Sequence, residues 1–150
     1  MKQLDETDKK IITLLLNDGR ISYADISKAV GMKPPSVIER IKKLEKEGII
    51  EQYTTKINYK ALGYDILAFI GISIDNAQHI EEFEETLKNF DDDVVECHHV
   101  TGDFTMLLKV ITKNTDTLSK LIKKLRNIPG VRQTNTILVF STIMNKVRNI

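Results

Sequence analysis

The sequence has a single cysteine, Cys97, no apolar run long enough to span a membrane, and no recognisable catalytic motif. One cysteine cannot form an internal disulfide framework. A membrane-spanning helix needs about 18 or more consecutive apolar residues. The amino-terminal stretch MKQLDETDKK also lacks the apolar centre of a signal peptide. These absences predict a cytoplasmic protein with no membrane partner.

Catalytic and metal-binding patterns are also missing. The sequence contains neither G-x-x-x-x-G-K-[ST] nor G-x-G-x-x-G, and no set of Ser, His and Asp forms a known nucleophile motif. Cys97-His98-His99 does not predict a zinc site, because adjacent side chains on a strand point to opposite faces and a structural site needs four ligands. Asp91-Asp92-Asp93 lacks the spacing of a calcium loop, so a solvated loop is expected. We therefore expect that the protein is not an enzyme and that it has neither a metal site nor a cofactor.

Charge is present in nearly balanced amounts but is unevenly distributed. The 150 residues are 41% hydrophobic and 29% charged, with a net charge of +1, which is typical of a globular protein. Residues 1–60 hold 12 basic and 9 acidic side chains, whereas residues 61–150 hold 10 and 12. This weak asymmetry favours nucleic acid as a partner of the first part and another ligand for the second.

The segment from Ser22 to Gly48 has the signals of two helices joined by a glycine turn. Ser22 and Asp25 match a capping box, which predicts a helix start, and Gly31 is a natural helix stop. The second helix opens at Lys33-Pro34-Pro35-Ser36, because proline is tolerated in a first helical turn. This is the layout of a helix-turn-helix, whose second helix enters the major groove of DNA.

The second predicted helix is amphipathic. Val37, Ile41 and Leu44 recur at the spacing of a buried stripe. From Lys33 to Gly48 five basic residues stand against three acidic ones, a balance of +2. Such residues can contact phosphates. The alternative is a solvated face stabilised by pairs such as Glu39–Lys43.

A preceding helix is predicted between the cap Asp5 and the stop Gly19, so three helices should share a small core. Tyr53–Ile57 then has an extended pattern, which suits a wing or a connecting strand. We divide the chain into a DNA-binding domain at residues 1–51, a linker or connecting strand at 52–64, and a second domain at 65–150.

The second domain has the pattern of alternating strands and helices. Strands are expected over 66–75, 94–101, 105–112 and 131–142, and helices over 79–90 and 115–128. The order strand-helix-strand, twice, predicts a ferredoxin-like βαββαβ arrangement with both helices on one sheet face. The whole chain is thus of the α+β class. The uncovered face predicts dimerisation, sheet against sheet.

The chain resembles the Lrp/AsnC family of prokaryotic transcriptional regulators almost from end to end. The resemblance lies in a series of short marks in order: Leu4-Asp5 with Asp8 and Ile11, Asp18-Gly19-Arg20-Ile21-Ser22, Val30-Gly31, Arg40-Ile41 with Leu44-Glu45 and Gly48-Ile49-Ile50, Ala61-Leu62-Gly63-Tyr64, Thr101-Gly102-Asp103-Phe104, and Pro129-Gly130-Val131 with Thr134 and Thr136. It implies a winged or plain helix-turn-helix followed by a ligand-sensing domain of split βαβ topology.

The resemblance also implies homodimers that assemble further, often into octamers, and a small effector, usually an amino acid, bound where dimers meet. The implied effector-binding residues are Gly102, Asp103, Phe104, Thr105, Thr134 and Thr136. The chemistry suits an amino acid, since Asp103 and turn carbonyls can accept from the ammonium while turn N–H groups and the two threonines can donate to the carboxylate. Without the resemblance, Gly102-Asp103 is an ordinary turn.

Two departures from the family pattern affect these expectations. Many members carry a second aspartate where this chain has Thr105, so one charge that could hold an ammonium is missing. Many also open the second helix with Ser-Pro-Ser, where this chain has Lys33-Pro34-Pro35, which reduces base reading from that turn. The DNA-binding candidates are Ser22, Tyr23, Lys33, Pro35, Ser36, Glu39, Arg40, Lys42 and Lys43.

Within this set, Ser36 and Glu39 are candidate base readers, Lys42 and Lys43 are expected at phosphates, and Arg40 is either a phosphate contact or part of a structural pair. The leading hypothesis is a sequence-specific transcriptional regulator in the cytoplasm, at the nucleoid, controlled by an amino acid. Alternatives are an architectural DNA binder of low specificity and a sensing protein that only associates with a partner.

Overall fold

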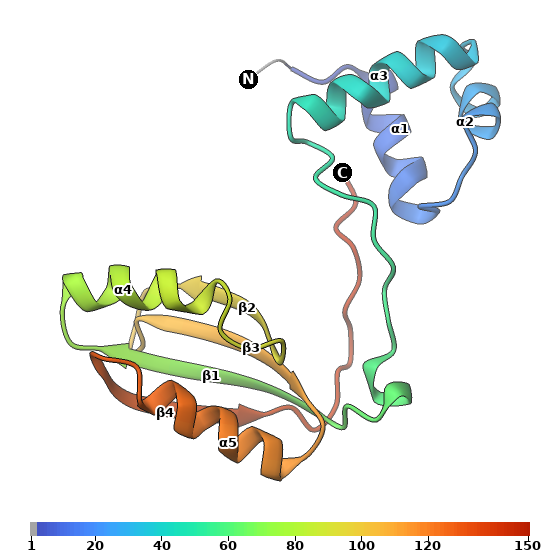
Figure 1. The fold of residues 1–150 in the computed structure, drawn as a ribbon. Coiled ribbons are helices and arrows are strands. Elements are labelled where there is room, and N and C mark those ends of the chain that lie inside the picture. Colours follow the sequence, from blue (N-terminus) through green and yellow to red (C-terminus); the bar gives the residue numbers. More distant parts are fainter. Residues whose placement is uncertain (1–2) are drawn as a thin grey trace. The chain divides into compact units, whose positions relative to one another are not determined.

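The computed structural model describes residues 3–150. Residues up to Lys56, together with Met144–Ile150, form one compact unit, and Ile57–Ile143 form a second. The change of unit at Lys56 falls inside the segment that we predicted as a linker. Each unit has its own hydrophobic core. The two units are described separately, and Figure 1 labels the helices and strands of each.

The first unit contains the three predicted helices, α1 (Glu6–Asn17), α2 (Tyr23–Val30) and α3 (Pro34–Lys46). Their fully buried side chains are Ile11, Ile26, Val37, Ile41 and Leu44. The stripe predicted for the second helix of the pair is thus confirmed in all three positions. Burial of each such side chain contributes about 1.5–3 kcal/mol, which is what holds these short helices in place.

The helix starts have the predicted side-chain caps. Asp5 and Asp8 form a reciprocal capping box at the start of α1. Ser22 caps α2 by accepting a hydrogen bond from the Asp25 N–H at 3.0 Å. The return bond from the Ser22 N–H to the Asp25 carboxylate, which would complete the expected box, is not formed within residues 3–150, so Ser22 acts as a simple N-cap.

Tyr53–Ile57, which suited either a wing or a connecting strand, forms no regular strand in the part of the chain that the structure describes. Residues 51–58 adopt neither helix nor strand, and Lys56 donates from Nζ to the Asn145 carbonyl at 2.8 Å. A single extended segment cannot form a ladder without a partner strand in the same unit. Of the two alternatives, neither a wing nor a regular connecting strand forms within residues 3–150, and the segment is an irregular connection.

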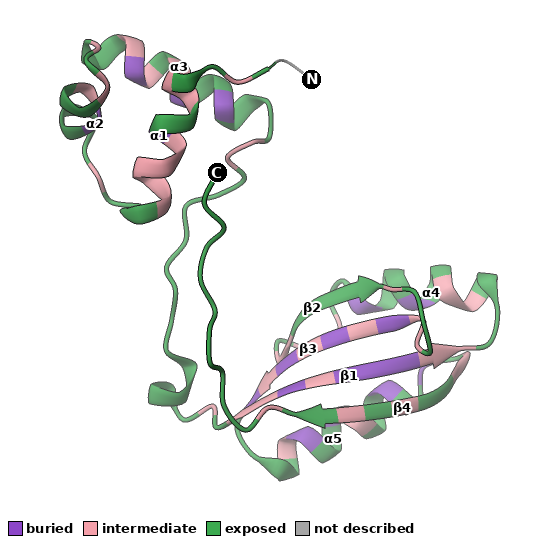
Figure 2. Ribbon diagram, turned by 180° about the vertical axis from the view of Figure 1, so that it is seen from behind, coloured by how far each residue is buried: buried purple, intermediate pink, exposed green. Residues whose placement is uncertain are grey.

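The second unit has the predicted βαββαβ order. After the short 3₁₀ helix η1 (Tyr59–Leu62) come β1 (Ile66–Ile74), α4 (Ala77–Leu87), β2 (Val94–His99), β3 (Met106–Thr112), α5 (Thr115–Arg126) and β4 (Val131–Leu138). The strands form one antiparallel sheet in the order β2-β3-β1-β4. Both helices cover the same face of this sheet (Figures 1 and 2).

The core of the second unit lies between the sheet and the two helices. Alternate residues of β1 and β3 belong to it, and the alternation of buried and partly buried positions along β3 is visible in Figure 2. Its twelve buried members are Ala68, Ile70, Ile72, Phe83, Leu87, Met106, Leu108, Val110, Leu118, Leu121, Leu125 and Ile128. This core fixes which face each strand residue occupies.

Element boundaries differ from the predictions where local hydrogen bonding decides them. The helix expected from residue 79 starts at Ala77, because Asn76 caps it by accepting from the His79 N–H at 3.0 Å. The last strand, expected to reach residue 142, ends at Leu138. Its final pairing bond runs from the Val139 N–H to the Leu67 carbonyl, next to the first residue of β1, and beyond that point no partner strand remains.

Candidate DNA-binding surface and effector site

The helix pair α2–α3 has helix-turn-helix geometry. Gly31 ends α2 in the left-handed conformation with φ of 70°, which a residue with a Cβ rarely adopts. The Ser27 hydroxyl donates to the Met32 carbonyl across this turn. The turn is therefore closed by its own hydrogen bonds, and α3 starts three residues later at Pro34.

The amino-terminal end of α3 has few free backbone donors. Lys33 occupies the cap position without a side-chain cap, and Pro34 and Pro35 have no N–H. The next two N–H groups, of Ser36 and Val37, both donate to the Lys33 carbonyl at 3.0 and 3.3 Å. The usual anion site of a helix start is thus closed here. DNA contacts of α3 must come from side chains.

Most of the candidate DNA-binding side chains are exposed, namely Ser22, Tyr23, Lys33, Pro35, Glu39, Lys42 and Lys43, while Ser36 and Arg40 are partly buried. The Glu39–Lys43 pair considered as an alternative does not form. Within residues 3–150, Lys33, Lys42 and Lys43 have no carboxylate partner. Their ammonium groups are available to a phosphate backbone.

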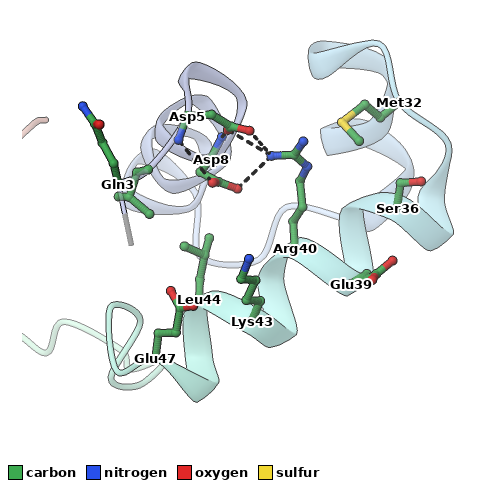
Figure 3. Close-up of a pocket in the computed structure, with 11 residues that line it drawn as sticks. Gln3, Asp5, Asp8, Met32, Ser36, Glu39, Arg40, Lys43, Leu44 and Glu47 are labelled. Atoms are coloured by element: carbon green, nitrogen blue, oxygen red, sulfur yellow. Dashed lines mark hydrogen bonds and ion pairs between the residues drawn. The ribbon is translucent and has the colours of Figure 1, made fainter. Parts of the chain in front are cut away.

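Arg40 has a different environment, which Figure 3 shows in close-up. Its Nη1 donates to both carboxylate oxygens of Asp5, at 2.9 and 2.7 Å, and to Oδ1 of Asp8 at 3.0 Å. These hydrogen bonds hold the pKa of the Asp5 carboxyl below its usual value. Arg40 therefore connects α3 to the capping box of α1. This ion pair is the structural alternative that the sequence left open beside a phosphate contact.

A surface hollow of about 460 Å³ adjoins this pair of helices. Met32, Ser36 and Glu39 line it from the turn and α3, and Asp5 and Asp8 line it from α1 (Figure 3). The side chains that line this hollow therefore belong both to the Arg40 pair and to the candidate base readers.

In the second unit, the predicted effector turn connects β2 to β3. Gly102 has φ of 104°. The Thr105 N–H donates to the Ile72 carbonyl at 2.8 Å, and the Thr105 hydroxyl accepts from the Ile74 N–H at 3.1 Å. Thr105 stands where many family members carry an aspartate. Its two hydrogen bonds hold the turn against the end of β1.

Phe104 lies on the sheet face that the helices do not cover. A Cβ placed on Gly71 would lie 2.6 Å from the Phe104 ring, so the ring occupies the space that a larger residue at 71 would need. Sequence reasoning did not identify Gly71. The signal was present, because a glycine inside the apolar strand ILAFIGISI indicates a close approach by another group.

Thr134 and Thr136 lie on the opposite, helix-covered side. They pair with Ile72 and Ile70 of β1, and directly opposed strand residues share a face. Arg126, in the last turn of α5, donates from Nε to the Thr134 hydroxyl at 3.0 Å. The structure therefore does not bring the six predicted effector residues together within one chain: the turn with Phe104 and the two threonines are on different faces.

The uncovered face carries apolar side chains beside a polar edge. Leu67, Phe69 and Ile111 are only partly buried, and Ile137 is half exposed. At the edge, Glu96 binds Lys109 at 3.3 Å and His98 at 2.9 Å. Cys97 and His99 instead line one small hollow beside Glu84 of α4, so these two side chains share a face of β2 and His98 lies on the other face, as expected for adjacent strand residues.

The charged residues after α4 have structural contacts. Asp91 pairs with Lys124 at 2.8 Å, and Asp93 accepts from the buried Thr112 hydroxyl at 2.6 Å. No helix within residues 3–150 combines the length and apolar character needed to cross a bilayer.

Comparison with known proteins adds two family matches. Residues 67–148 match the model of the Lrp/AsnC ligand binding domain, and residues 4–51 match a winged helix-turn-helix DNA-binding domain. The HTH-type transcriptional regulator FL11 of Pyrococcus horikoshii is 39% identical over 139 residues, which is 93% of this chain and 91% of FL11. The leucine-responsive regulatory protein of Salmonella typhimurium is 34% identical, with 98% and 91% covered.

Solved structures agree with this assignment. Escherichia coli AsnC superposes with a TM-score of 0.91 at 28% identity, covering 99% of this chain and all of AsnC. A transcriptional regulator from Neisseria meningitidis, solved in complex with L-Met, has a TM-score of 0.89 at 27% identity, with 96% and 94% covered. With a DNA-binding helix pair and a ligand-binding domain of the matching fold, the chain belongs to the Lrp/AsnC family of DNA-binding transcriptional regulators.

Proposed function

We propose that this protein is a sequence-specific regulator whose DNA affinity or assembly is controlled by an amino acid. The observation that carries the DNA-binding part is the set of unpaired lysines on α3 beside a well-formed helix-turn-helix. Under this proposal residues 1–51 bind DNA, 52–64 connect, and 65–150 bind the effector and form oligomers. Such a regulator works at the chromosome, which places it in the cytoplasm at the nucleoid.

On α3 we assign phosphate contacts to Lys42 and Lys43, with Lys33 at the turn. Ser36 and Glu39 are the groups with hydrogen-bonding atoms near the helix start, and we assign base reading to them. Arg40 is held by Asp5 and Asp8, so we assign it the structural role. Ser22, Tyr23 and Pro35 contribute contact surface around the helix start.

We further propose that two copies pair through the uncovered sheet face, and that dimers assemble into octamers or related rings. The apolar side chains of Leu67, Phe69 and Ile137 on this face support the pairing. In a dimer, two α3 helices would reach half-sites about 10 bp apart, or a multiple of that spacing.

The effector assignment rests on the ligand-binding domain and on the L-Met complex of the Neisseria relative. The twenty amino acids should be tested at millimolar concentration by thermal shift, because a ligand that binds the folded state raises its stability by mass action. We expect stabilisation by at least one of them. If none raises the melting temperature, an amino-acid effector is excluded.

The DNA-binding part is tested by reversing Lys42 and Lys43 to Glu. Loss of two phosphate contacts and the added repulsion should weaken operator binding on the order of 100-fold at physiological salt, with a smaller salt dependence. A matched reversal of Lys120 and Lys123 on α5 should leave DNA binding unchanged. Competition between a footprinted operator and bulk DNA then tests specificity, since an architectural binder would give a ratio near one.

A further inference from the structure

The carboxyl-terminal turn of α5 holds an arginine with unused donors. Arg126 Nε donates to Thr134 Oγ1 at 3.0 Å, and the two terminal amino groups make no ion pair or hydrogen bond within residues 3–150. Lys123 and Lys124 occupy the same helical turn. A cation at this position also complements the helix dipole, but the bond to Thr134 gives the guanidinium a fixed direction along β4.

The two threonines of β4 add donors on the same side. Thr134 already accepts from Arg126, so its hydroxyl proton is free to be donated elsewhere. Thr136 is two residues further on and therefore on the same face. A guanidinium with two amino groups free, flanked by hydroxyl groups, is a donor arrangement suited to a carboxylate.

The effector turn itself lies on the other side of the sheet. Phe104 packs against Gly71 on the uncovered face, and the Ser73 hydroxyl donates to the Asp103 carbonyl at 3.4 Å on that same face. Arg126 and the backbone of the turn that carries Asp103 thus lie on opposite faces of the sheet in one chain. An α-amino acid, whose ammonium and carboxylate are joined through one carbon, cannot reach both in a single chain.

We propose that Arg126, positioned by Thr134, binds the α-carboxylate of the effector, while Asp103 of a second copy binds its ammonium. This inference rests on the proposed amino-acid effector and adds to it the residue that recognises the carboxylate. It also makes the site incomplete without another copy of the chain. Arg126 touches the ligand directly, and Thr134 is a positioning residue.

The test compares an amino acid with its α-carboxamide, which keeps the ammonium and side chain but loses the negative charge. L-Methionine and L-methioninamide are the first pair, followed by the amino acid that gives the largest thermal shift and its amide. Binding is measured by titration calorimetry at about pH 6.5, where the α-amino groups of both the amino acid and its amide are charged. Wild-type protein should bind the acid at least about tenfold more tightly than the amide, as charge-assisted bonds are stronger than neutral ones.

Arg126→Gln should lose this preference and bind acid and amide alike, whereas Arg126→Lys should keep part of it. Thr134→Val, which leaves the arginine but removes its hydrogen-bond partner, should weaken acid binding several-fold. Lys120→Gln on the same helix is the matched control and should bind as the wild type does. The melting temperature of each ligand-free variant shows that the fold is retained.

The outcomes separate the two proposals. If no amino acid binds the wild type, the proposed effector is wrong and this inference falls with it. If the wild type binds an amino acid and Arg126→Gln keeps the preference for acid over amide, the effector stands but Arg126 is not its carboxylate partner. Should Arg126→Gln fail to fold, the preference measured for Arg126→Lys and Thr134→Val decides the question.

Discussion

The candidate functional residues of the two units lie on different kinds of secondary structure. In the first unit, the candidate DNA contacts stand mainly on one helix, and five buried side chains with one arginine pair hold that helix. In the second, the candidate effector residues come from a turn, an edge strand and a helix end around a core of twelve. The candidate DNA contacts gather on one surface of the first unit, whereas the candidate effector residues lie on both faces of the sheet.

This difference shows in how each surface depends on the rest of its unit. The α3 surface needs only that the helix stays docked on α1 and α2. The effector site needs the sheet register, because a shift by one residue would move Thr134 to the other face. Substitutions of residues that hold these two surfaces in place test the comparison, and they are given in order of decreasing expected effect.

The largest effect is expected from Ile41→Ala in the small core of the first unit. Ile41 is 1% exposed, and removing most of such a side chain costs about 2–5 kcal/mol because a cavity remains. Calorimetry should show the first unit melting earlier while the second keeps its transition. Ile38→Ala, on the same helix but only partly buried, should cost clearly less. A single transition that moves as a whole would show that the units unfold together.

Gly71→Ala should disturb the second unit by displacing the Phe104 ring. The new Cβ would lie 2.6 Å from that ring, and overpacking of this kind costs about 1–3 kcal/mol. Urea unfolding measures the loss. Gly19→Ala, where nothing lies within 4 Å of the added Cβ, is the control and should stay within about 0.5 kcal/mol. Adding Phe104→Ala should relieve most of the cost, and an additive result would contradict the contact.

Arg40→Gln separates the structural role from a phosphate contact. Without the guanidinium, the bonds to Asp5 and Asp8 are lost and α3 is held less firmly against α1. Operator binding should weaken by roughly tenfold, or about 1.4 kcal/mol. The slope of the logarithm of affinity against the logarithm of salt concentration should stay unchanged. Lys43→Gln, in contrast, should lower that slope by about 0.9, the value for one phosphate contact. An equal decrease for Arg40→Gln would place Arg40 on the DNA.

The smallest effect is a difference in pH dependence. The Asp75 carboxylate accepts a hydrogen bond from His79 Nδ1 at 2.5 Å, which raises the pKa of His79, so the stability from this pair is present below about pH 6.5 and is lost as pH rises through the folded-state pKa. The lowered pKa of Asp5 has the opposite effect. The stability that its ionised carboxylate contributes is present above about pH 3.9 and is lost as pH falls through the folded-state pKa.

Melting temperatures of His79→Gln and Asp5→Asn, followed against pH, check these signs. Each variant should differ from the wild type by at most about a few degrees, and in opposite pH ranges. His79→Gln should flatten the curve of the second unit near neutral pH, and Asp5→Asn that of the first in acid. Curves parallel to the wild type in both ranges would contradict the assignment.

The fold could be predicted because its signals are local. The stripe of Val37, Ile41 and Leu44 depends on helical spacing alone, and so does the choice of Ser22 and Gly31 as helix boundaries. The βαββαβ order of elements followed from the alternation of strand and helix patterns. Tyr53–Ile57, for which a wing and a connecting strand were both considered, forms no strand within residues 3–150, and β4 is shorter than predicted. A strand lasts only as far as another strand pairs with it, which the local pattern does not record.

The site residues depend on contacts that are distant in sequence. Arg40 and Asp5 are 35 positions apart, so the sequence left open whether the arginine binds DNA or a carboxylate. The resemblance supplied Thr134 but not the bond to Arg126, and Phe104 but not the glycine beneath it. Which sheet face each residue occupies followed only once the register was known.

The placement of Phe104 and Thr134 on opposite faces of one sheet has a consequence for sensing. If one effector molecule needs the turn of one copy and Arg126 of another, ligand binding and self-association are linked through mass action. The apparent affinity for the effector then rises with the concentration of the protein itself. The same amino-acid level would be registered in a cell with many copies of the regulator and missed in one with few.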